Sequence, residues 1–160
     1  MTGAALFKVG MLVVDIERAM RDLGVWLALD WTPVQESPLS IATASGREDV
    51  KLRFAYSLGA APHLELIEAL ATGYYAAAAG PHLHHVGRWV DDLASESATL
   101  ERAGLAREAA GIGADGVTPA LFAFHRGAHG LRVELVDAAM RANFEGWLAG
   151  GVLQLDAMRV

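Results

Sequence analysis

Phe7-Lys8-Val9-Gly10 and His84-His85-Val86-Gly87 decide the fold, because each stretch opens one half of an internal repeat. The pattern x-Val-Gly-x-x-Val-x-Asp, followed by Ile or Leu, runs over 8–16 and again over 85–93. The two halves also close alike, the first with His63-Leu-Glu-Leu-Ile-Glu68 and the second with Arg132-Val-Glu-Leu-Val-Asp137. Because the motifs recur in the same order, we interpret the chain as a duplicated module.

Hydrophobic periodicity predicts similar elements in both halves. The apolar run 6–14 is typical of a buried strand, and Asp15 is a suitable N-cap for the helical pattern that follows it. The second half repeats this order with a strand over 83–90 and a helix from Asp92 to about Ala103. Further strands are predicted at 52–58, 64–69, 119–126 and 131–137. Residues 32–49, with two prolines, are predicted as loop with a short strand at 39–43, and the glycine-containing 109–118 as loop.

The predicted fold class is α+β, with two tandem β-α-β-β-β modules whose strands form a curved mixed sheet, a cup, with the helices outside. The first module is assigned to 1–72, a small-residue linker to 73–81 and the second module to 82–137. Residues 138–160 are assigned to an amphipathic helix, ending at Gly150-Gly151, and an apolar tail.

Composition narrows the class of protein. Of 160 residues 53% are hydrophobic and the mean hydropathy is +0.28, which suffices for a packed interior and suggests buried surface in a homodimer. The absence of cysteine excludes disulfides, thiolate nucleophiles and Cys-ligated metals. A formal charge of −6 without a Lys/Arg cluster argues against nucleic acid as a partner. No apolar run approaches the ~18 residues of a membrane span, and no secretory signal pattern is seen, so we expect a cytoplasmic protein that acts on small molecules.

Strand alternation places charged residues on the inner faces of otherwise apolar strands. Alternate residues of a strand share a face. The outward faces of the closing strands carry only Leu and Val and are expected to pack against the helices. Polar groups inside apolar strands are costly unless they pair or bind something. The inner-face candidates are Lys8, Glu65, His85 and Glu134, with His63 and Arg132 on the faces of the two glutamates.

Other polar and aromatic residues give weaker signals. Four aromatic residues are candidates for a pocket wall, beside His63 and Arg132: Tyr56, Trp89, Phe124 and Trp147. The cluster at 82–85 resembles a metal motif, but alternation predicts that His84 points away from His85 and is partly exposed. His125 and His129 flank a predicted turn and are expected to be solvated. The pair Tyr74-Tyr75 beside the linker carries no functional signal.

The ordered recurrence of these motifs resembles the vicinal oxygen chelate superfamily, which includes glyoxalase I, methylmalonyl-CoA epimerase, extradiol dioxygenases and bleomycin- and fosfomycin-resistance proteins. The likeness spans Phe7 to about Asp137 and is nearest to epimerase-like or glyoxalase-like members. It implies paired modules that curve into one cup, with metal ligands from the opening and closing strand of each module. The matching positions here are Lys8, Glu65, His85 and Glu134. Lys8 departs from the pattern, because a protonated lysine is a poor ligand and repels a divalent cation.

Three hypotheses for the four positions follow from this resemblance. In the first, Mn²⁺, Fe²⁺, Co²⁺, Ni²⁺ or Zn²⁺ binds through Glu65, His85 and Glu134, with water or substrate at an open position. In the second, the Lys8 ammonium replaces the charge of the metal and stabilises an enolate or oxyanion, while His85 or a glutamate moves the proton. In the third, the four residues are a buried salt-bridge network, and the cup holds a ligand or nothing.

The resemblance implies a small-molecule enzyme with isomerase- or lyase-type proton transfer. The aromatic residues of the cup suggest a fairly hydrophobic, oxygenated substrate, with no organic cofactor and no membrane partner. One alternative is a metal-free binding protein that sequesters a drug, as resistance proteins do. A second alternative is a metal-dependent dioxygenase.

Overall fold

The computed structural model describes residues 5–77 and 80–154, in which the order β-α-β-β-β occurs twice. The first half comprises β1 (Lys8–Val13), α1 (Ile16–Leu27), β2 (Gln35–Thr43), β3 (Gly46–Tyr56) and β4 (His63–Glu68). The second comprises β5 (His82–Val90), α2 (Leu93–Arg102), β6 (Ala106–Ile112), β7 (Pro119–Arg126) and β8 (Arg132–Asp137). A 3₁₀ turn, η1 (Ala138–Met140), then leads into α3 (Arg141–Leu148). Residues 78–79 of the predicted linker and 155–160 of the predicted tail lie outside the described residues.

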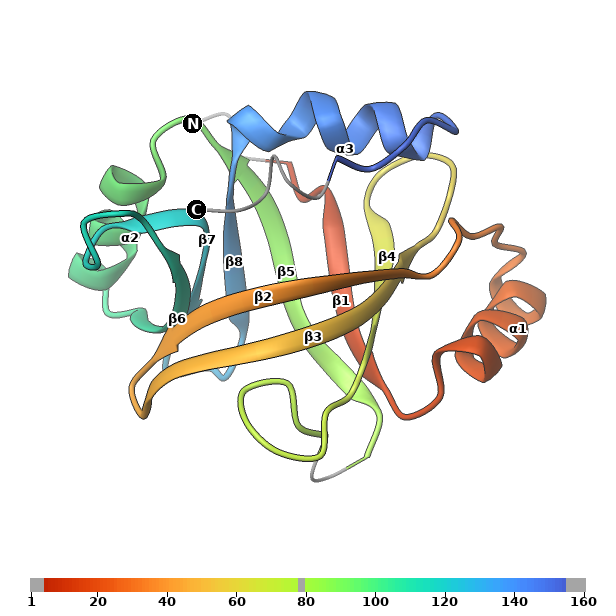
Figure 1. Cartoon of the computed structure of the whole chain (residues 1–160), viewed down its shortest axis with the longest axis horizontal. Helices are drawn as coiled ribbons and strands as arrows, with labels where there is room; N and C mark the ends of the chain where they lie inside the picture. The colour runs from red at the N-terminus through yellow and green to blue at the C-terminus, as the bar shows by residue number, and fades with distance from the viewer. Residues whose placement is uncertain (1–4, 78–79, 155–160) are drawn as a thin grey trace.

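The eight strands form one closed barrel in the order β1-β4-β3-β2-β6-β7-β8-β5 (Figure 1). The predicted α+β class is confirmed, and the curved sheet closes on itself within a single chain. The opening strands of the two halves, β1 and β5, pair antiparallel, and each pairs in parallel with the closing strand of its own half. The two halves also meet at β2 and β6, and this second junction, the β2–β6 seam, is short. It consists of the pairs Ala42↔Ala110 and Thr43↔Ala109.

Both long helices lie outside the barrel and begin at the predicted caps. The Asp15 carboxylate accepts a hydrogen bond from the Arg18 N–H at 2.8 Å, and Asp92 accepts one from the Ser95 N–H at 2.9 Å. Such bonds satisfy backbone donors that have no partner within the helix. The outward face of β4 packs against α1 around Leu66, and that of β8 packs against α2 around Leu135, as alternation predicts.

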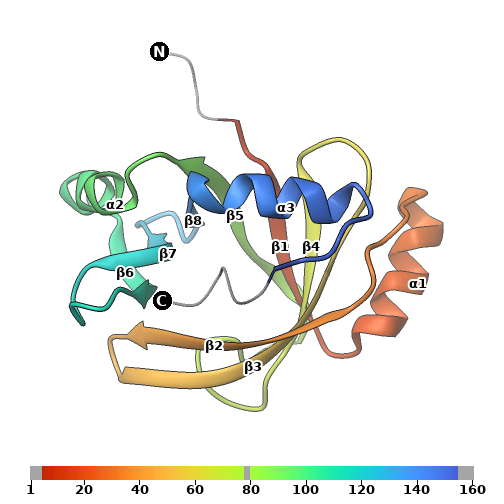
Figure 2. The ribbon, with the colours of Figure 1, turned by 45° about the horizontal axis from the view of Figure 1, so that its top comes forward.

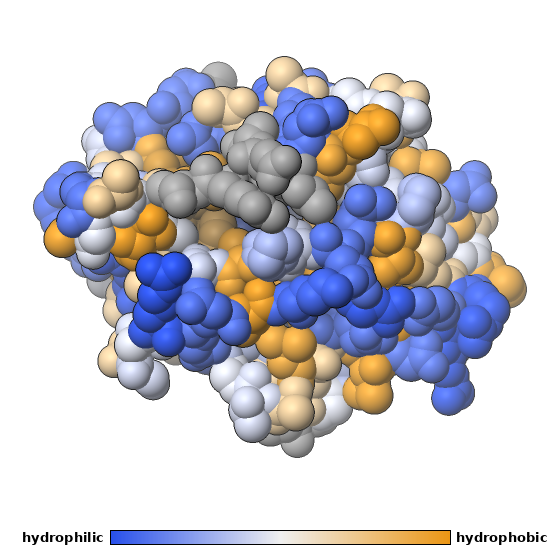
Figure 3. Space-filling model, in the orientation of Figure 1, coloured by the Kyte–Doolittle hydropathy of each residue, from blue (hydrophilic) through white to orange (hydrophobic). Residues whose placement is uncertain are grey.

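Two stretches predicted mainly as loop contain more strand than expected. The stretch 32–49 contains all of β2 and the start of β3, which form a long hairpin from Gln35↔Phe54 to Thr43↔Gly46. Pro38 is tolerated because β2 pairs with β6 only at its far end, so the missing N–H faces no ladder partner. The stretch 109–118 begins with the end of β6, where small residues such as Ala109 and Ala110 are buried. The outer face of the β2–β3 hairpin is polar and carries ion pairs such as Lys51–Glu36 (Figure 3).

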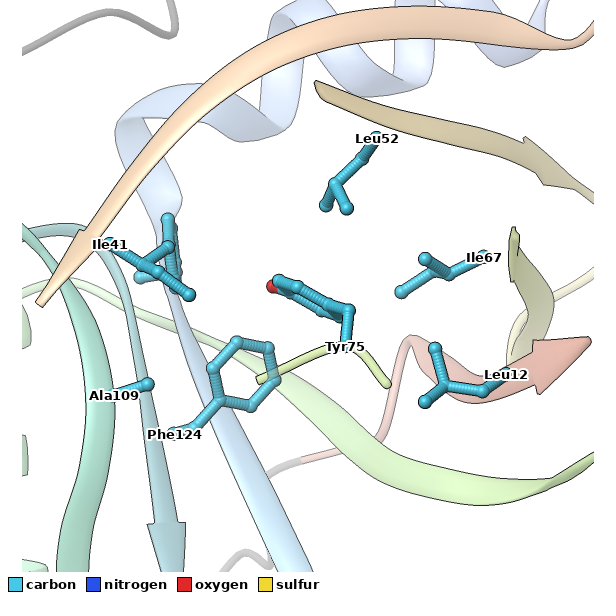
Figure 4. Packing of buried hydrophobic residues seen from close by; sticks show 8 residues of the cluster. Leu12, Ile41, Leu52, Ile67, Tyr75, Ala109 and Phe124 are labelled. Carbon is cyan, nitrogen blue, oxygen red and sulfur yellow. The ribbon is translucent and has the colours of Figure 1, made fainter. Parts of the chain in front are cut away.

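The two ends of the barrel are covered by different segments. α3 lies across one end, above β1, β4, β5 and β8, and the β4–β5 connection lies at the other end (Figures 1 and 2). The apolar interior between them surrounds Tyr75, which is held among Leu52, Ile67 and Phe124 (Figure 4). No helix among the described residues is long and apolar enough to cross a membrane.

Candidate functional site

Four charged side chains meet inside the barrel, each from a different strand. The strands β4, β1, β5 and β8 are consecutive neighbours in the closed sheet, so their inward side chains converge. Although charged, these side chains belong to residues only 3% to 6% exposed. We call them the charged quartet: Lys8 of β1, Glu65 of β4, His85 of β5 and Glu134 of β8.

The quartet alternates positive and negative groups at ion-pair distance. Lys8 Nζ lies 3.1 Å from Glu65 Oε2 and 2.6 Å from Glu134 Oε2. His85 Nε2 lies 3.0 Å and 3.1 Å from the same two oxygens. Each carboxylate therefore bridges the lysine and the histidine, which compensates the cost of burying the four groups.

The glycines of the repeated Val-Gly pairs make this approach possible. Lys8 faces Gly87 across the β1–β5 ladder, and Gly10 faces His85. A Cβ at Gly87 would lie 2.6 Å from Lys8 Cγ, and one at Gly10 would lie 2.0 Å from His85 Cε1. The glycine of each half thus gives room to the site residue of the other half.

Tyr56 of β3 fixes one side of the quartet. Lys8 Nζ donates to the Tyr56 hydroxyl at 3.1 Å, and that hydroxyl donates to Glu65 Oε1. Burial and the neighbouring carboxylates raise the pKa of Tyr56 well above its ordinary value, so the phenol keeps its proton and remains a donor. Among the described residues no comparable hydrogen bond holds Glu134.

The electrostatics of the quartet keep Lys8 charged. Burial alone would lower the pKa of Lys8, but the carboxylates of Glu134 and Glu65 raise it overall. Burial alone would raise the pKa of Glu65, but the Lys8 ammonium and His85 lower it well below the usual range. Burial alone would lower the pKa of His85, but the charge of Glu134 and the hydrogen bonds to Glu134 and Glu65 together raise it.

A largely apolar cavity of about 130 Å³ adjoins the quartet. The sequence candidates Tyr56, Trp89 and Phe124 line it. Tyr75, to which the sequence assigned no role, also lines it, because its loop turns the ring inward rather than toward solvent (Figure 4). Trp147, a further candidate for the aromatic wall, also lines the cavity, and α3 places it across one end together with Phe144, which the sequence provided no reason to select.

Two predicted pocket residues do not line this cavity. His63 lies beside an outer pocket behind Phe144, and its Nδ1 is 3.0 Å from the carbonyl oxygen of Ser57. The Arg132 guanidinium donates to Glu108 at 2.6 Å and to the carbonyl oxygen of His84 at 3.1 Å.

Two predictions about histidine exposure are wrong. His84 is buried, because the register of β5 shifts between Gly10↔His85 and Met11↔Leu83, which turns both neighbouring histidines inward. Its Nδ1 lies 3.0 Å from Nδ1 of His85. His125 is also fully buried, with Nε2 2.9 Å from Ser97 Oγ, because α2 packs over β7 at this point.

Comparison with known families identifies the fold. The family described as Glyoxalase/Bleomycin resistance protein/Dioxygenase superfamily matches residues 7–124. The chain belongs to this superfamily. The match begins at Phe7, where the first copy of the repeat opens. A search of curated protein sequences found no significant match.

Solved structures of this superfamily fold resemble the chain over most of its length. A methylmalonyl-CoA epimerase from Mycobacterium tuberculosis is 18% identical with a TM-score of 0.60, covering 86% of this chain and 91% of the epimerase. A methylmalonyl-CoA epimerase in complex with methylmalonyl-CoA and NH₄⁺ is 17% identical, with a TM-score of 0.58 and coverages of 84% and 94%. A hypothetical protein from Bacillus halodurans C-125 is 18% identical, with a TM-score of 0.57 and coverages of 85% and 95%. At these identities the likeness establishes the fold alone.

Members of the superfamily often use divalent metals, and three residues of the quartet carry atoms that could bind one. Ligand atoms of Glu65, His85 and Glu134 lie within 4.8 Å of one another, and three buried atoms of these residues make no aligned hydrogen bond. These three ligands by themselves would suit a divalent metal ion that keeps open coordination positions for water or substrate. However, Lys8 Nζ lies 2.6 Å and 3.1 Å from the two carboxylate oxygens, and a charged ammonium there repels a divalent cation. With Lys8 present, the residues do not fit a divalent metal.

Proposed function

We propose that this chain is a small-molecule enzyme that transfers a proton at a carbon next to a carbonyl group, an isomerase- or lyase-type reaction. The observation that carries the proposal is the Lys8 ammonium, buried against two carboxylates on the wall of an apolar cavity. A fixed positive charge beside candidate bases, in a site that excludes water, is what enolate formation requires.

Glu134 is the better placed base of the two glutamates. Both glutamates contact Lys8 and His85. Glu65 also accepts a hydrogen bond from Tyr56, whereas among the described residues Glu134 accepts no such hydroxyl bond. Glu134 takes the proton from the carbon, the electrons of the broken C–H bond move to the carbonyl oxygen, and an enolate forms. The enolate oxygen accepts a hydrogen bond from Lys8. Return of the proton from Glu134 to the carbon regenerates the carbonyl and the starting enzyme. Where His85 delivers the proton instead, Glu134 passes its own proton to His85 Nε2, 3.1 Å away, and the starting enzyme is restored.

Glu65 and Tyr56 act as positioning residues for Lys8. They hold its Nζ at 3.1 Å each, so the ammonium does not need to reorganise when charge develops on the substrate. Removing a preorganised donor of this kind costs about 10²–10³ in rate in other enzymes. The epimerase activity named for the similar structures is itself an isomerisation, which supports the reaction class.

A metal-free binding protein is the second candidate. The observation that favours it is that every charged group on the cavity wall is already paired with another. In that case the quartet stabilises the barrel and orients a ligand, and no proton is transferred.

Deuterium incorporation separates the two candidates. Carbonyl compounds (a cyclic ketone, an aryl ketone, a 2-oxo acid and an acyl-CoA) are incubated with the protein in D₂O, and exchange of the hydrogens next to the carbonyl is followed by NMR. We expect catalysed exchange of at least one compound, reduced about 100-fold or more in Lys8→Met and in Glu134→Gln. The exposed pair Lys51→Met and Glu36→Gln are the matched controls and should leave it unchanged. Ligand binding without any exchange would contradict the enzyme and favour the binding protein.

A further inference from the structure

The walls of the cavity are mostly apolar beyond the quartet, with polar groups on Ser37, Tyr56, Tyr75 and Asn143. Aromatic rings from both halves of the barrel and from α3 surround the space. They include Phe54, Trp89, Phe122, Phe124, Phe144 and Trp147. Rings of this kind bind flat apolar groups by burial and by offset or edge-to-face stacking.

The charged side chains on the cavity wall are all paired with one another. The quartet supplies all the charged side chains that line the cavity among the described residues, and Lys8 is shared between the two glutamates and Tyr56. A carboxylate or phosphate entering the cavity would lose its water and find no cation left without a partner. Burying an unpaired charge is far more costly than burying a neutral carbonyl or hydroxyl that receives a hydrogen bond.

The size of the cavity also limits the size of the ligand that it can hold. Its volume is about 130 Å³. An engineered apolar cavity of about 150 Å³ in another protein binds benzene. One six-membered ring with a short substituent is therefore the scale of ligand that fits without movement of the walls.

The outer pocket does not supply the missing positive charge. It shares Phe7, Trp89 and Phe144 with the cavity, so it lies beyond the aromatic end of that space. Its arginine, Arg141, is exposed and already paired with Glu145 at 2.6 Å. Among the described residues this pocket therefore offers no unpaired arginine or lysine to a phosphate group.

We propose that the cavity takes an uncharged molecule of one ring, aromatic or alicyclic, whose carbonyl or hydroxyl oxygen lies beside the quartet and receives a Lys8 hydrogen bond when Glu134, on taking up a proton, releases it. This inference rests on the proposed function for the role of that oxygen and narrows the substrate class. The ring lies among the aromatic side chains, and no carboxylate or phosphate of the ligand enters the cavity.

Binding to the wild-type chain tests the substrate class directly. Cyclohexanone, cyclohexanecarboxylate and acetyl-CoA are titrated by calorimetry, with Trp89 and Trp147 as fluorescence reporters in the cavity wall. We expect cyclohexanone to bind at one per chain and the carboxylate at least about tenfold more weakly. Tighter binding of cyclohexanecarboxylate or acetyl-CoA than of cyclohexanone would overturn the proposal.

Two variants of β2 test whether the ligand binds in the cavity. Leu39 lines the cavity, whereas its neighbour Ser40 is exposed. Leu39→Phe should weaken cyclohexanone binding about tenfold by filling the space, and Ser40→Phe should not. Unchanged binding in a folded Leu39→Phe variant would place the ligand elsewhere and overturn the proposal.

Failure of this inference is distinguishable from failure of the proposed function. Cyclohexanone that binds in the cavity but shows no deuterium exchange supports the ligand class and contradicts the enzyme. Exchange of an acyl-CoA or a 2-oxo acid, with cyclohexanone neither bound nor exchanged, supports the enzyme and overturns the ligand class.

Discussion

Lys8 is the residue at which the two halves of the duplicated chain differ most in chemistry. The equivalent position in the second half is His85, and the two side chains reach the same pair of carboxylate oxygens. A histidine at position 8 would present a neutral nitrogen where the chain now has an ammonium. The choice between metal chemistry and lysine chemistry therefore depends on this one side chain.

The first prediction is that Lys8→His converts the quartet into a metal site. The wild type, purified without chelators, should contain no stoichiometric metal, whereas the variant should bind about one Zn²⁺, Ni²⁺ or Mn²⁺ per chain, since two histidines and two carboxylates then converge. Elemental analysis and isothermal titration measure this. Lys51→His, an exposed lysine of β3, is the control. Stoichiometric metal in the wild type would contradict the lysine-for-metal hypothesis.

The second prediction concerns the glycines opposite the two site residues. Gly87→Ala should displace Lys8 and Gly10→Ala should displace His85, because the new Cβ atoms would lie 2.6 Å and 2.0 Å from those side chains. Each should lower the free energy of unfolding by roughly 1–3 kcal/mol, measured by urea denaturation. Gly146→Ala in α3 meets nothing within 4 Å and should leave stability unchanged or raise it. Equal stability of all three variants would show that the close approaches impose no constraint.

At the residue scale, strand alternation predicts the inward orientation of the quartet side chains but not that of the neighbouring His84. A period of two places all four side chains on inner faces, and the structure brings them together. The same period fails at His84, since a register shift breaks the alternation by one residue. A bulge depends on how two distant strands pair, so it leaves no mark in the sequence of either one. Tyr75 was missed for a related reason, because periodicity assigns no direction to a loop residue.

At the element scale, the contact between α2 and β7 depends on a buried histidine. His125 of β7 is fully buried, with its ring nitrogens 2.9 Å from Ser97 Oγ and 3.1 Å from the carbonyl oxygen of Leu105. Burial lowers the pKa of His125 below its ordinary value of 6.5, because the charged ring would lose its hydration. Between its lowered native pKa and 6.5, His125 is therefore mostly neutral in the native state and mostly protonated in the unfolded chain.

The third prediction follows from the sign of that shift. The lowered native pKa of His125 stabilises the fold above pH 6.5, and this contribution falls as pH drops below 6.5 toward the native value. The slope reaches at most about 1.4 kcal/mol per pH unit. Urea denaturation between pH 7.5 and 5.5 should show a shallower loss of stability in His125→Gln than in the wild type. His129→Gln, exposed on the same hairpin, should keep the wild-type slope, and equal slopes in all three proteins would contradict the assignment.

The elements themselves are predicted to different degrees. The capped helices and the opening and closing strands were identified because each combines an apolar pattern with a clear N-cap or turn. β2 was predicted only in part, as the short strand 39–43, and β6 was missed. Many of their residues are small, polar or proline, and they become strands through pairing with neighbouring strands. Strand formation there is decided by tertiary context rather than by local propensity.

At the scale of the whole molecule, two distant parts of the chain close the cavity. The β2–β6 seam completes the barrel wall, and α3 covers one end with Phe144 and Trp147 (Figure 2). The chain after α3 then returns to this helix as far as Gln154, where the Asn143 side chain donates to the carbonyl oxygen of Gln154 at 3.1 Å and accepts from its N–H at 3.0 Å. The sequence predicted the helix but not its place over the cavity, because no periodicity encodes which surface an amphipathic helix covers.

The fourth prediction is that Phe144 limits the rate at which a ligand reaches the quartet. Its ring packs edge-on against Phe7, Tyr56 and Trp89, with centroid distances of 5.5, 4.8 and 5.7 Å, between the cavity and the outer pocket. A ligand that enters from the outer pocket has to pass this ring, and movements of such covering segments often set association and release rates. Phe144→Ala should therefore raise both rate constants for cyclohexanone by roughly tenfold while changing the Kd less, as measured by stopped-flow Trp fluorescence. Leu148→Ala on the same helix removes an apolar side chain that does not line the cavity and should leave both rates near the wild-type values. Unchanged rates in Phe144→Ala would mean that ligands enter by another route, between strands rather than beneath α3.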